Sequence, residues 1–210
     1  MATAIETRHE SKTRLLEAAL QVIRAKGYSA TRVEDICEAA GLTKGSFFHH
    51  FSSKEDLALA AAEFWIEGTG ALFASARYQK EADPLDRLLS YIDFRKGLLQ
   101  GELPDYTCLV GTMVQEVYDT HPALREACNR SITTHAATLT PMIAEAMAQR
   151  GIKADWTAES LALYVQASIQ GAFILAKAQH GVAVAEDCLD HLHRYVELLF
   201  RPQPSPHRAR

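Results

Sequence analysis

Residues 41–57 read GLTKGSFFHHFSSKEDL, a stretch that holds a glycine turn, a short helix and the start of a longer one. Gly41 marks a helix end, because glycine readily adopts the left-handed conformation that closes many helices. A short helix then follows Thr43 and ends near Phe51. Since about two turns of helix are marginal in water, we expect Phe47 and Phe51, four residues apart, to anchor it against earlier helices.

The side chains on the outward face of this short helix include hydrogen-bond donors that could contact bases and phosphates in the DNA major groove. The groove admits one helix, whose first residues read base edges while flanking donors grip phosphates. Ser52, Lys54 and the free N–H groups at the next helix start would add an anion site. The alternative is a plain helix–helix turn with a solvated lysine. The outward set comprises Lys44, Ser46, Phe48, His49 and His50.

Outward from this stretch, apolar residues recur at three- and four-residue steps without sustained alternation, which indicates helices. Capping boxes are predicted at residues 31–34 and 52–55. The predicted fold class is all-α, with a three-helix helix-turn-helix DNA-binding domain in 1–54, a larger helical domain in 55–200 and a disordered tail in 201–210. About nine helices are predicted, over residues 10–26, 31–41, 43–51, 52–75, 84–99, 108–119, 122–150, 157–179 and 186–200, with a kink at Pro141 and a loop over 100–107.

Composition excludes several classes of protein. The hydrophobic content of 48% can build a core, while no apolar run approaches the length of a membrane span and the N-terminus lacks a signal-peptide core. Residues 1–54 hold eight Lys/Arg against six Asp/Glu, and the remainder holds fourteen against twenty. This balance fits a slightly basic head on an acidic body. The widely spaced Cys37, Cys108, Cys128 and Cys188 fit neither a disulfide scaffold nor a zinc motif.

From Arg14 through Leu57 the chain reads RLLEAALQVIRAKGYSATRVEDICEAAGLTKGSFFHHFSSKEDL. This stretch strongly resembles the DNA-binding domain of the TetR/AcrR family of bacterial transcriptional regulators. The resemblance implies roles for the residues at matching positions. Base edges would be contacted by Lys44, Ser46 and His49, and phosphates by Thr31, Thr43, His50 and Lys54.

Two positions depart from that family pattern. Phe48 stands where the family often has tyrosine, so it lacks the hydroxyl that meets a phosphate. Glu34 stands where a basic residue is common, and its carboxylate would repel phosphate, although it can accept from a cytosine amino group. Arg32 is the candidate to compensate.

One short recognition helix reads few base pairs. The helix-turn-helix domains of two copies of the chain are therefore expected to read a palindromic operator in double-stranded DNA together. The last two helices are the expected homodimer surface, where two from each chain would form a four-helix bundle. The alternative is that the same apolar stripes face the protomer's own core. The predicted interface residues are Phe173, Ile174, Leu189, Leu192, Tyr195, Val196 and Leu199.

The middle helices are expected to surround a cavity for a small-molecule effector. Gln166 and Gln170 are polar, one turn apart, on an otherwise apolar helix. Buried amides need partners, so these two either bond to neighbours or orient an effector. The candidate lining residues, of which we expect fewer than half to touch a ligand, are Trp65, Phe73, Tyr91, Phe94, Cys108, Met113, Tyr118, His135, Met142, Gln166, Gln170 and Phe173.

Cys108 opens the segment CLVG, where the positive end of a helix dipole favours a thiolate. Lys177 would strengthen this effect if it lies near. The segment also resembles a subgroup of TetR-like proteins in which a cysteine at this place senses electrophiles or oxidants, although Thr107 replaces the glycine usual before it. The alternative is a small buried hydrophobe.

These observations favour a cytoplasmic regulator, a repressor that a small molecule or an electrophile releases from its operator. A thiol- or metal-dependent enzyme is the alternative, with Cys108 as nucleophile and His135 as base. Cys188 and His191 could share a metal, but two ligands do not make a site. We therefore expect no catalytic residue, no metal, no cofactor and no membrane partner.

Overall fold

The computed structural model describes the backbone of residues 2–201 and the side chains of residues 9–201. Every regular element in this part of the chain is a helix, which confirms the predicted all-α class. The elements are α1 (Ala2–Lys26), α2 (Val33–Ala40), α3 (Lys44–His50), α4 (Lys54–Ser75), the 3-10 helix η1 (Arg77–Lys80), α5 (Pro84–Gly97), α6 (Leu103–Tyr106), α7 (Leu109–Val117), α8 (Pro122–Ala137), α9 (Thr140–Gln149), α10 (Ala158–Gln179) and α11 (Ala183–Leu199).

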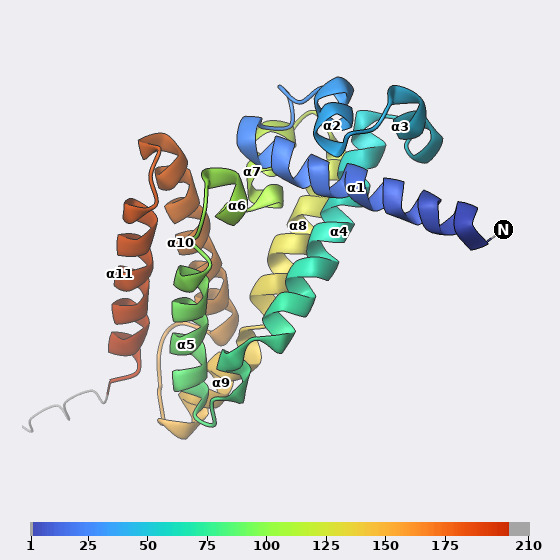
Figure 1. Cartoon of the computed structure of the whole chain (residues 1–210). Coiled ribbons are helices and arrows are strands. Elements are labelled where there is room, and N and C mark those ends of the chain that lie inside the picture. Colours follow the sequence, from blue (N-terminus) through green and yellow to red (C-terminus); the bar gives the residue numbers. More distant parts are fainter. Residues whose placement is uncertain (1, 202–210) are drawn as a thin grey trace, which may run out of the picture.

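The helices α1, α2 and α3 form a small head at one end of the molecule (Figure 1). Phe47 and Phe51 are 0% and 3% exposed, and their ring centroids lie 5.8 Å apart, so the predicted anchor is confirmed. Gly41 ends α2 with a φ of 61°, as expected. Arg14 of α1 donates to the carbonyl of Ala40 at 2.6 Å. These contacts stabilise a short α3 that would be marginal alone.

Both helices are capped one residue later than expected, α2 by a capping box and α4 by a single N-cap side chain. Arg32 is the N-cap of α2, and its backbone N–H donates to Asp35 at 2.7 Å. Ser53 is the N-cap of α4 and accepts from a first-turn N–H at 3.0 Å. The first shift has a physical cause: the hydroxyl of Thr31 is buried and donates to the carbonyl of Gly27 at 2.6 Å, so it is not available to cap α2.

The long helices α4 and α8 run together away from the head, and α5, α10 and α11 stand beside them (Figure 1). The sequence predicts one kinked helix over 122–150. The chain instead breaks between Ala137 and Thr140, and Pro141 lies in the first turn of α9. Proline cannot donate a helical hydrogen bond, so it is tolerated at a helix start and not inside a helix. The predicted loop over 100–107 contains the short helix α6.

Two apolar clusters fill the molecule. One joins the head to α4, α7 and α8, and the other joins α5, α9, α10 and α11. Cys108 packs against both clusters and therefore lies where they meet. The predicted domain boundary after residue 54 falls in the first turn of α4, which packs on α1 in the head and on α8 in the body. That boundary stays a prediction.

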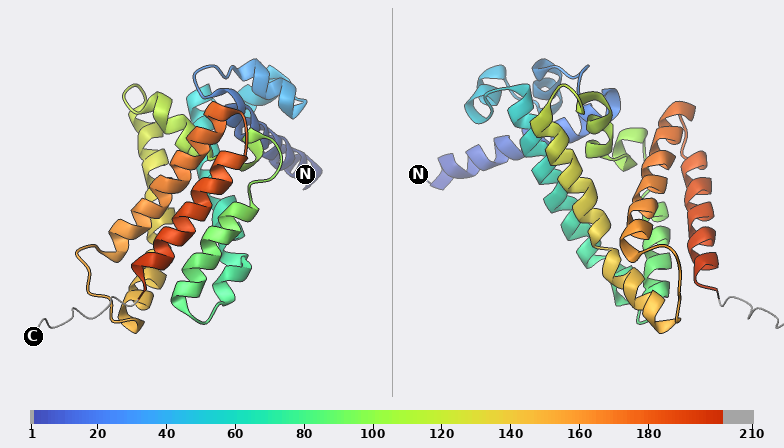
Figure 2. Two further views of the ribbon diagram at one scale, coloured as in Figure 1. Left: turned by 90° about the vertical axis from the view of Figure 1, so that its left-hand side faces the viewer. Right: turned by 180° about the vertical axis from the view of Figure 1, so that it is seen from behind.

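The helices α10 and α11 lie side by side on the outer face of the body (Figure 2, left). By length and composition alone, α4 and α10 could each cross a membrane. This is weak evidence, because core helices meet the same criteria and α10 buries Leu161, Val165 and Ile169. Apart from residue 201, the tail predicted to be disordered lies outside the described residues.

Candidate DNA-binding surface and ligand cavity

The outward side of α3 carries the predicted base-reading residues. Thr43 is the N-cap of α3 and accepts from the backbone N–H of Ser46, which is half-buried, at 3.2 Å. Phe48 is 57% exposed although it is large and apolar, and Lys44 and His49 are exposed as well. A short helix pinned from behind, with a lysine, an aromatic ring and a histidine outward, has the form of a helix that enters the major groove.

Glu34 of α2 forms an ion pair with Lys44 of α3 on this surface. The hydrogen bond from Lys44 is the main reason that the pKa of Glu34 is lowered. The two side chains are 52% and 57% exposed, so water screens the pair and Lys44 can exchange it for DNA at little cost. Arg32, at 75% exposed, lies 3.5 Å from Asp35 and adds a second cation to the surface.

Three residues with predicted phosphate roles have partners inside the protein. Thr31 is 1% exposed. The ammonium of Lys54 donates to the carbonyls of Tyr28 and Thr31, both at 3.0 Å, lies 4.3 Å from the Tyr28 ring centroid, and has a pKa lowered by burial. His50 Nε2 lies 2.7 Å from the hydroxyl of Ser11. In this conformation Thr31 and Lys54 therefore support the loop before α2, and neither side chain is positioned to grip a phosphate.

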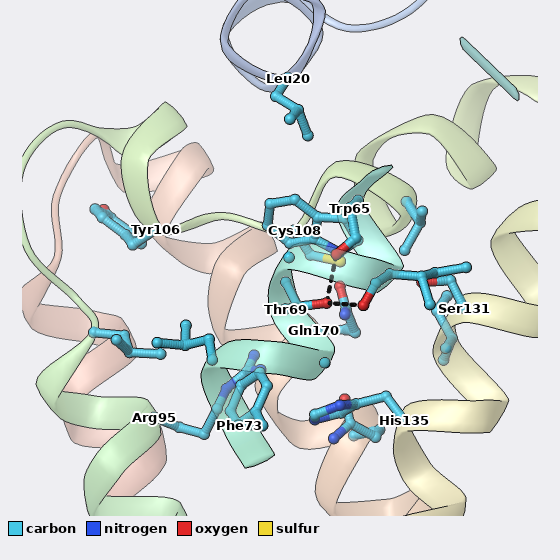
Figure 3. A pocket seen from close by; sticks show the side chains of 18 of the residues that line it. Leu20, Trp65, Thr69, Phe73, Arg95, Tyr106, Cys108, Ser131, His135 and Gln170 are labelled. Atoms are coloured by element: carbon cyan, nitrogen blue, oxygen red, sulfur yellow. Dashed lines mark hydrogen bonds between the residues drawn. The ribbon is translucent and has the colours of Figure 1, made fainter. Parts of the chain in front are cut away.

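A cavity of about 400 Å³ lies between the head and the body, within the range of small-ligand pockets. Its wall is mostly apolar, with polar groups from several helices between the apolar side chains. Leu20 of α1 lies at the head end, whereas Arg95, Phe73 and His135 gather at the opposite end, which we call the floor (Figure 3).

The candidate lining residues divide between the cavity wall and other places. Those on the wall are Trp65, Phe73, Cys108, His135, Gln166, Gln170 and Phe173. Those wholly or partly buried in the packed clusters behind the wall are Phe94, Met113 and Met142, together with Tyr91, whose hydroxyl bonds to two wall residues. Tyr118 is 62% exposed, because it follows the end of α7 and turns to solvent. These five do not line the cavity.

Three hydrogen-bonded side chains lie at the floor. The amide of Gln166 donates to the hydroxyl of Tyr91 at 2.9 Å, and that hydroxyl lies 2.9 Å from Nε2 of His135. Burial, helped by the charge of Arg95, lowers the pKa of His135 to about 4. We assign Nε2 of the neutral ring as the acceptor and Nδ1 as the protonated nitrogen, because the Tyr91 hydroxyl already accepts from Gln166 and has its own proton to donate. Gln166 is thus satisfied by a neighbour, whereas Gln170 has no hydrogen-bond partner among the described residues.

Cys108 lies on the wall and is the N-cap of α7, where its sulfur accepts from the backbone N–H of Gly111 at 3.4 Å. The ammonium of Lys177 donates to the hydroxyl of Thr112 at 2.6 Å. Burial lowers the pKa of Lys177, and the nearby Cys108 opposes this shift. Burial likewise lowers the pKa of Arg24, which Asp105 and Cys108 oppose. The hydroxyl of Thr112 also donates to the carbonyl of Cys108 at 2.8 Å, so a single hydroxyl separates Lys177 from the backbone of Cys108.

Arg24 connects the head to the cavity, and the sequence analysis did not single it out. It belongs to α1, is 8% exposed and lines the cavity. Its guanidinium donates to the carbonyls of Asp105 and Thr107 at 3.3 and 3.4 Å and lies 5.1 Å from the ring centroid of Trp65. A basic residue in the last turn of a helix ordinarily indicates a partner for the helix dipole, so no sequence signal marked it as buried.

Glu116 of α7 makes a second connection to the head. Its carboxylate accepts from the backbone N–H groups of Tyr28 and Ser29 at 3.2 and 2.8 Å. It packs against Gly27, whose φ is 85° and where any Cβ would collide with the carboxylate. The glycine that ends α1 is therefore required both for its conformation and for this close approach.

The predicted dimer stripe mostly faces the protomer's own core, as the alternative reading allowed. Its members with 0–6% exposure are Phe173, Leu189, Leu192 and Val196, and Leu199 is partly buried. Only Ile174 and Tyr195 of the predicted set are exposed. The physical reason is that the most regular apolar stripe on an amphipathic helix is the one that its own core requires.

A different apolar surface covers the outer side of the same two helices. Its members, which we call the outer face, are Leu163, Tyr164, Ile174, Leu175, Tyr195 and Leu198. The rings of Tyr164 and Tyr195 lie 5.1 Å apart and join α10 to α11. Most of the large apolar side chains exposed in the described chain lie here.

The two side chains named in the enzyme alternative have separate hydrogen-bond partners. The nucleophile and the base proposed for it are not hydrogen-bonded to each other within the described residues, since His135 bonds to Tyr91 and Cys108 to Gly111. No group of three His, Cys, Asp or Glu side chains in residues 9–201 could hold a metal.

The head with its exposed recognition helix, joined to a body that encloses a cavity, defines a helix-turn-helix DNA-binding protein with a candidate ligand site. Comparison with known families leads to the same class. Residues 15–61 match the bacterial regulatory proteins of the tetR family, and residues 84–192 match the tetracyclin repressor-like C-terminal domain. The chain belongs to the TetR family and is a DNA-binding transcriptional regulator.

Several known proteins are similar to this chain over most of its length. The HTH-type transcriptional regulator CymR of Pseudomonas putida is 29% identical over 80% of each chain. The transcriptional regulator AcuR of Cereibacter sphaeroides is 30% identical over 79% of this chain and 75% of its own. The crystal structure of a TetR transcriptional regulator from Chloroflexus aurantiacus matches with a TM-score of 0.79 and 28% identity, covering 91% of this chain and 96% of that chain.

Proposed function

We propose that this protein is a cytoplasmic repressor that binds a palindromic operator as a homodimer and releases it when an effector occupies the cavity. The proposal rests on the position of Arg24, because this residue belongs to α1 of the head and also lines the cavity. A ligand that displaces its guanidinium from the carbonyls of Asp105 and Thr107 would change how α1 sits on the body. Occupancy of the cavity and affinity for DNA would then be coupled, each changing the other.

The test of operator binding uses the DNA just upstream of the protein's own gene. We expect affinity to fall linearly with salt on logarithmic axes, because phosphate neutralisation releases counterions. Lys44→Ala and His49→Ala should each cost roughly 1–3 kcal/mol and change the sequence preference. If Lys44→Ala leaves both affinity and preference intact, the proposed docking of α3 is wrong.

The outer face of α10 and α11 supports the homodimer. Large exposed apolar patches on soluble proteins mark interaction sites, and pairing two copies through this face would present two heads to two half-sites. Tyr195→Glu and Leu198→Glu should convert the dimer to a monomer in light scattering. Tyr118→Glu, which changes an exposed aromatic residue elsewhere, should not. A wild-type protein that is monomeric at working concentration would remove this part of the proposal.

A second mode of release is supported by the surroundings of Cys108. The sulfur lies on the cavity wall, and the hydroxyl of Thr112 joins the carbonyl of Cys108 to the ammonium of Lys177. A maleimide would be attacked at its carbon–carbon double bond, forming a sulfur–carbon bond while the adjacent carbon takes up a proton. Operator release by maleimide from wild type but not from Cys108→Ser is the expected result. Equal release from both, or none from either, would remove Cys108 from the mechanism.

A further inference from the structure

We infer that the effector is an organic acid, a carboxylate with an apolar body, and that Arg95 at the floor of the cavity binds its carboxylate. This inference rests on the proposed function, because it names the ligand class of the same cavity. It concerns a residue that neither the sequence pattern nor the resemblance to the family singled out.

Arg95 differs from the other cations of α5. Arg87 pairs with Glu145 at 3.6 Å, and Lys96 pairs with Asp190 at 2.7 Å. Arg95 is half-buried, and among the described residues it has neither a carboxylate partner nor a hydrogen-bond acceptor. Its guanidinium is always charged and carries five N–H donors, which leaves a cation on the wall without a counter-charge.

Two aromatic rings fix the position of this guanidinium. It lies 5.3 Å from the ring centroid of Phe73 and 5.6 Å from that of Phe173. Cation–π contacts of this kind hold the planar group while leaving its N–H edge available. The side chain is therefore oriented in advance, and a ligand would lose little entropy in ordering it.

The neighbouring polar groups also offer donors. The ring of His135 packs against that of Phe73 with the centroids 4.5 Å apart and the planes tilted by 56°, so Arg95 and His135 flank the same phenylalanine (Figure 3). With Nε2 of His135 assigned as the acceptor from the Tyr91 hydroxyl, its Nδ1 is left as an N–H donor. A ligand group that meets both Arg95 and His135 must accept hydrogen bonds, which describes a carboxylate better than an amine.

The charges on the wall agree with this choice. The charged lining residues are Arg24, Arg95 and Asp105. The carboxylate of Asp105 already accepts from the backbone N–H of Glu102 at 2.8 Å and from the amide of Gln21 at 3.3 Å, beside α1 at the head end. The floor therefore keeps an uncompensated positive charge, and a bidentate pair with Arg95 would neutralise it. The apolar remainder of the acid would extend along the apolar wall toward Trp65 and Leu20.

The experiment measures ligand binding without DNA. The whole protein carries Trp156→Phe, so that Trp65 on the wall is the one remaining tryptophan. Its fluorescence is titrated with two matched pairs of probes, 4-phenylbutanoate against 4-phenylbutanamide and octanoate against octanamide. We expect each acid to bind about tenfold or more tightly than its amide. Arg95→Gln should abolish this preference, Arg95→Lys should keep part of it, and Arg77→Gln, an exposed arginine on η1, should leave it unchanged.

The outcomes separate this inference from the proposed function. Equal binding of acid and amide by wild type, binding of none of the four probes, or an acid preference that survives in folded Arg95→Gln would each overturn the inference. Circular dichroism shows whether that variant is folded, and Arg95→Lys, which keeps the charge, still tests the preference if it is not. The proposed function fails on a different measurement, the absence of operator binding by the ligand-free protein.

Discussion

The carboxylate of Glu116 accepts a hydrogen bond of 2.8 Å from the backbone N–H of Ser29 and so joins α7 of the body to the loop between α1 and α2. The other end of α7 begins at Cys108 on the cavity wall. One short helix therefore connects the cavity with the loop between α1 and α2 in the head.

Glu116→Ala should uncouple the two sites. Without the carboxylate, the 28–29 loop no longer follows α7, so we expect ligand-free operator affinity near that of wild type and a smaller loss of affinity on adding an acid that releases wild type. Fluorescence anisotropy with labelled operator measures both quantities. Glu126→Ala, an exposed change on α8, is the matched control. Normal release from Glu116→Ala would show that α7 does not carry the signal through this contact.

Lys54→Met should weaken the fold more than it weakens DNA binding. The variant keeps the aliphatic stem but leaves the carbonyls of Tyr28 and Thr31 without their charged donor, which should cost about 1–3 kcal/mol of unfolding free energy. Urea denaturation measures this loss, with Lys80→Met on η1 as the control. Unchanged stability together with a shallower salt dependence of operator binding would instead favour the phosphate contact that the family resemblance implies.

Glu34→Gln should tighten DNA binding and reduce its selectivity. The substitution removes the partner that holds Lys44 and also a negative charge that faces the phosphates. We expect affinity for unrelated DNA to rise more than affinity for the operator, with a steeper salt dependence. The exposed Glu38→Gln on the same helix controls for net charge. An identical effect from both variants would mean that the pair itself has no role.

Phe48→Tyr should strengthen operator binding. The ring is 57% exposed on α3, so an added hydroxyl needs no room inside the protein. A new phosphate contact would contribute about 0.5–1.5 kcal/mol, the usual net value of a hydrogen bond. Affinity that is unchanged or weaker in a titration of labelled operator would mean that the DNA backbone does not pass this side chain.

His135 should make the protein sensitive to acid. Its folded pKa of about 4 lies below its ordinary value of 6.5. As the pH falls through 6.5, the unfolded chain binds a proton that the folded chain does not bind until about pH 4. Stability is therefore lost in this window, by about 2 kcal/mol between pH 7 and pH 5. His135→Gln should flatten this slope in denaturation measured at both pH values, whereas His191→Gln, exposed on α11, should not. Identical slopes for wild type and His135→Gln would refute the assignment.

The head was predictable because its signals are local. Gly27 and Gly41 end helices with positive φ, and Phe47 and Phe51 lie one turn apart on a helix too short to stand alone. The N-cap of α2 was misplaced by one residue because Thr31 uses its hydroxyl on the preceding turn, a contact that no spacing rule contains.

The cavity and the dimer face depend on contacts between distant helices, so the sequence predicted them only in part. The polar pair Gln166 and Gln170 was correctly placed on the wall because it interrupts an apolar helix. Arg24 and Arg95 were missed, since a cation in the last turn of a helix ordinarily points to solvent. Leu189 was assigned to the wrong surface, because periodicity identifies an apolar face without telling which neighbour covers it.

The contacts of Arg24 and Glu116 limit how freely such regulators can be recombined. A chimera that joins residues 1–54 of a relative to this body would keep that relative's recognition helix. It would also place new side chains against the carbonyls of Asp105 and Thr107, which Arg24 contacts here, and against Glu116. If the cavity controls DNA binding as proposed, a grafted head without an arginine at position 24 and a glycine at position 27 should bind its operator without responding to the cavity. Exchanging the outward residues of α3 alone leaves both contacts intact, so operator specificity can be reprogrammed there while the response is retained.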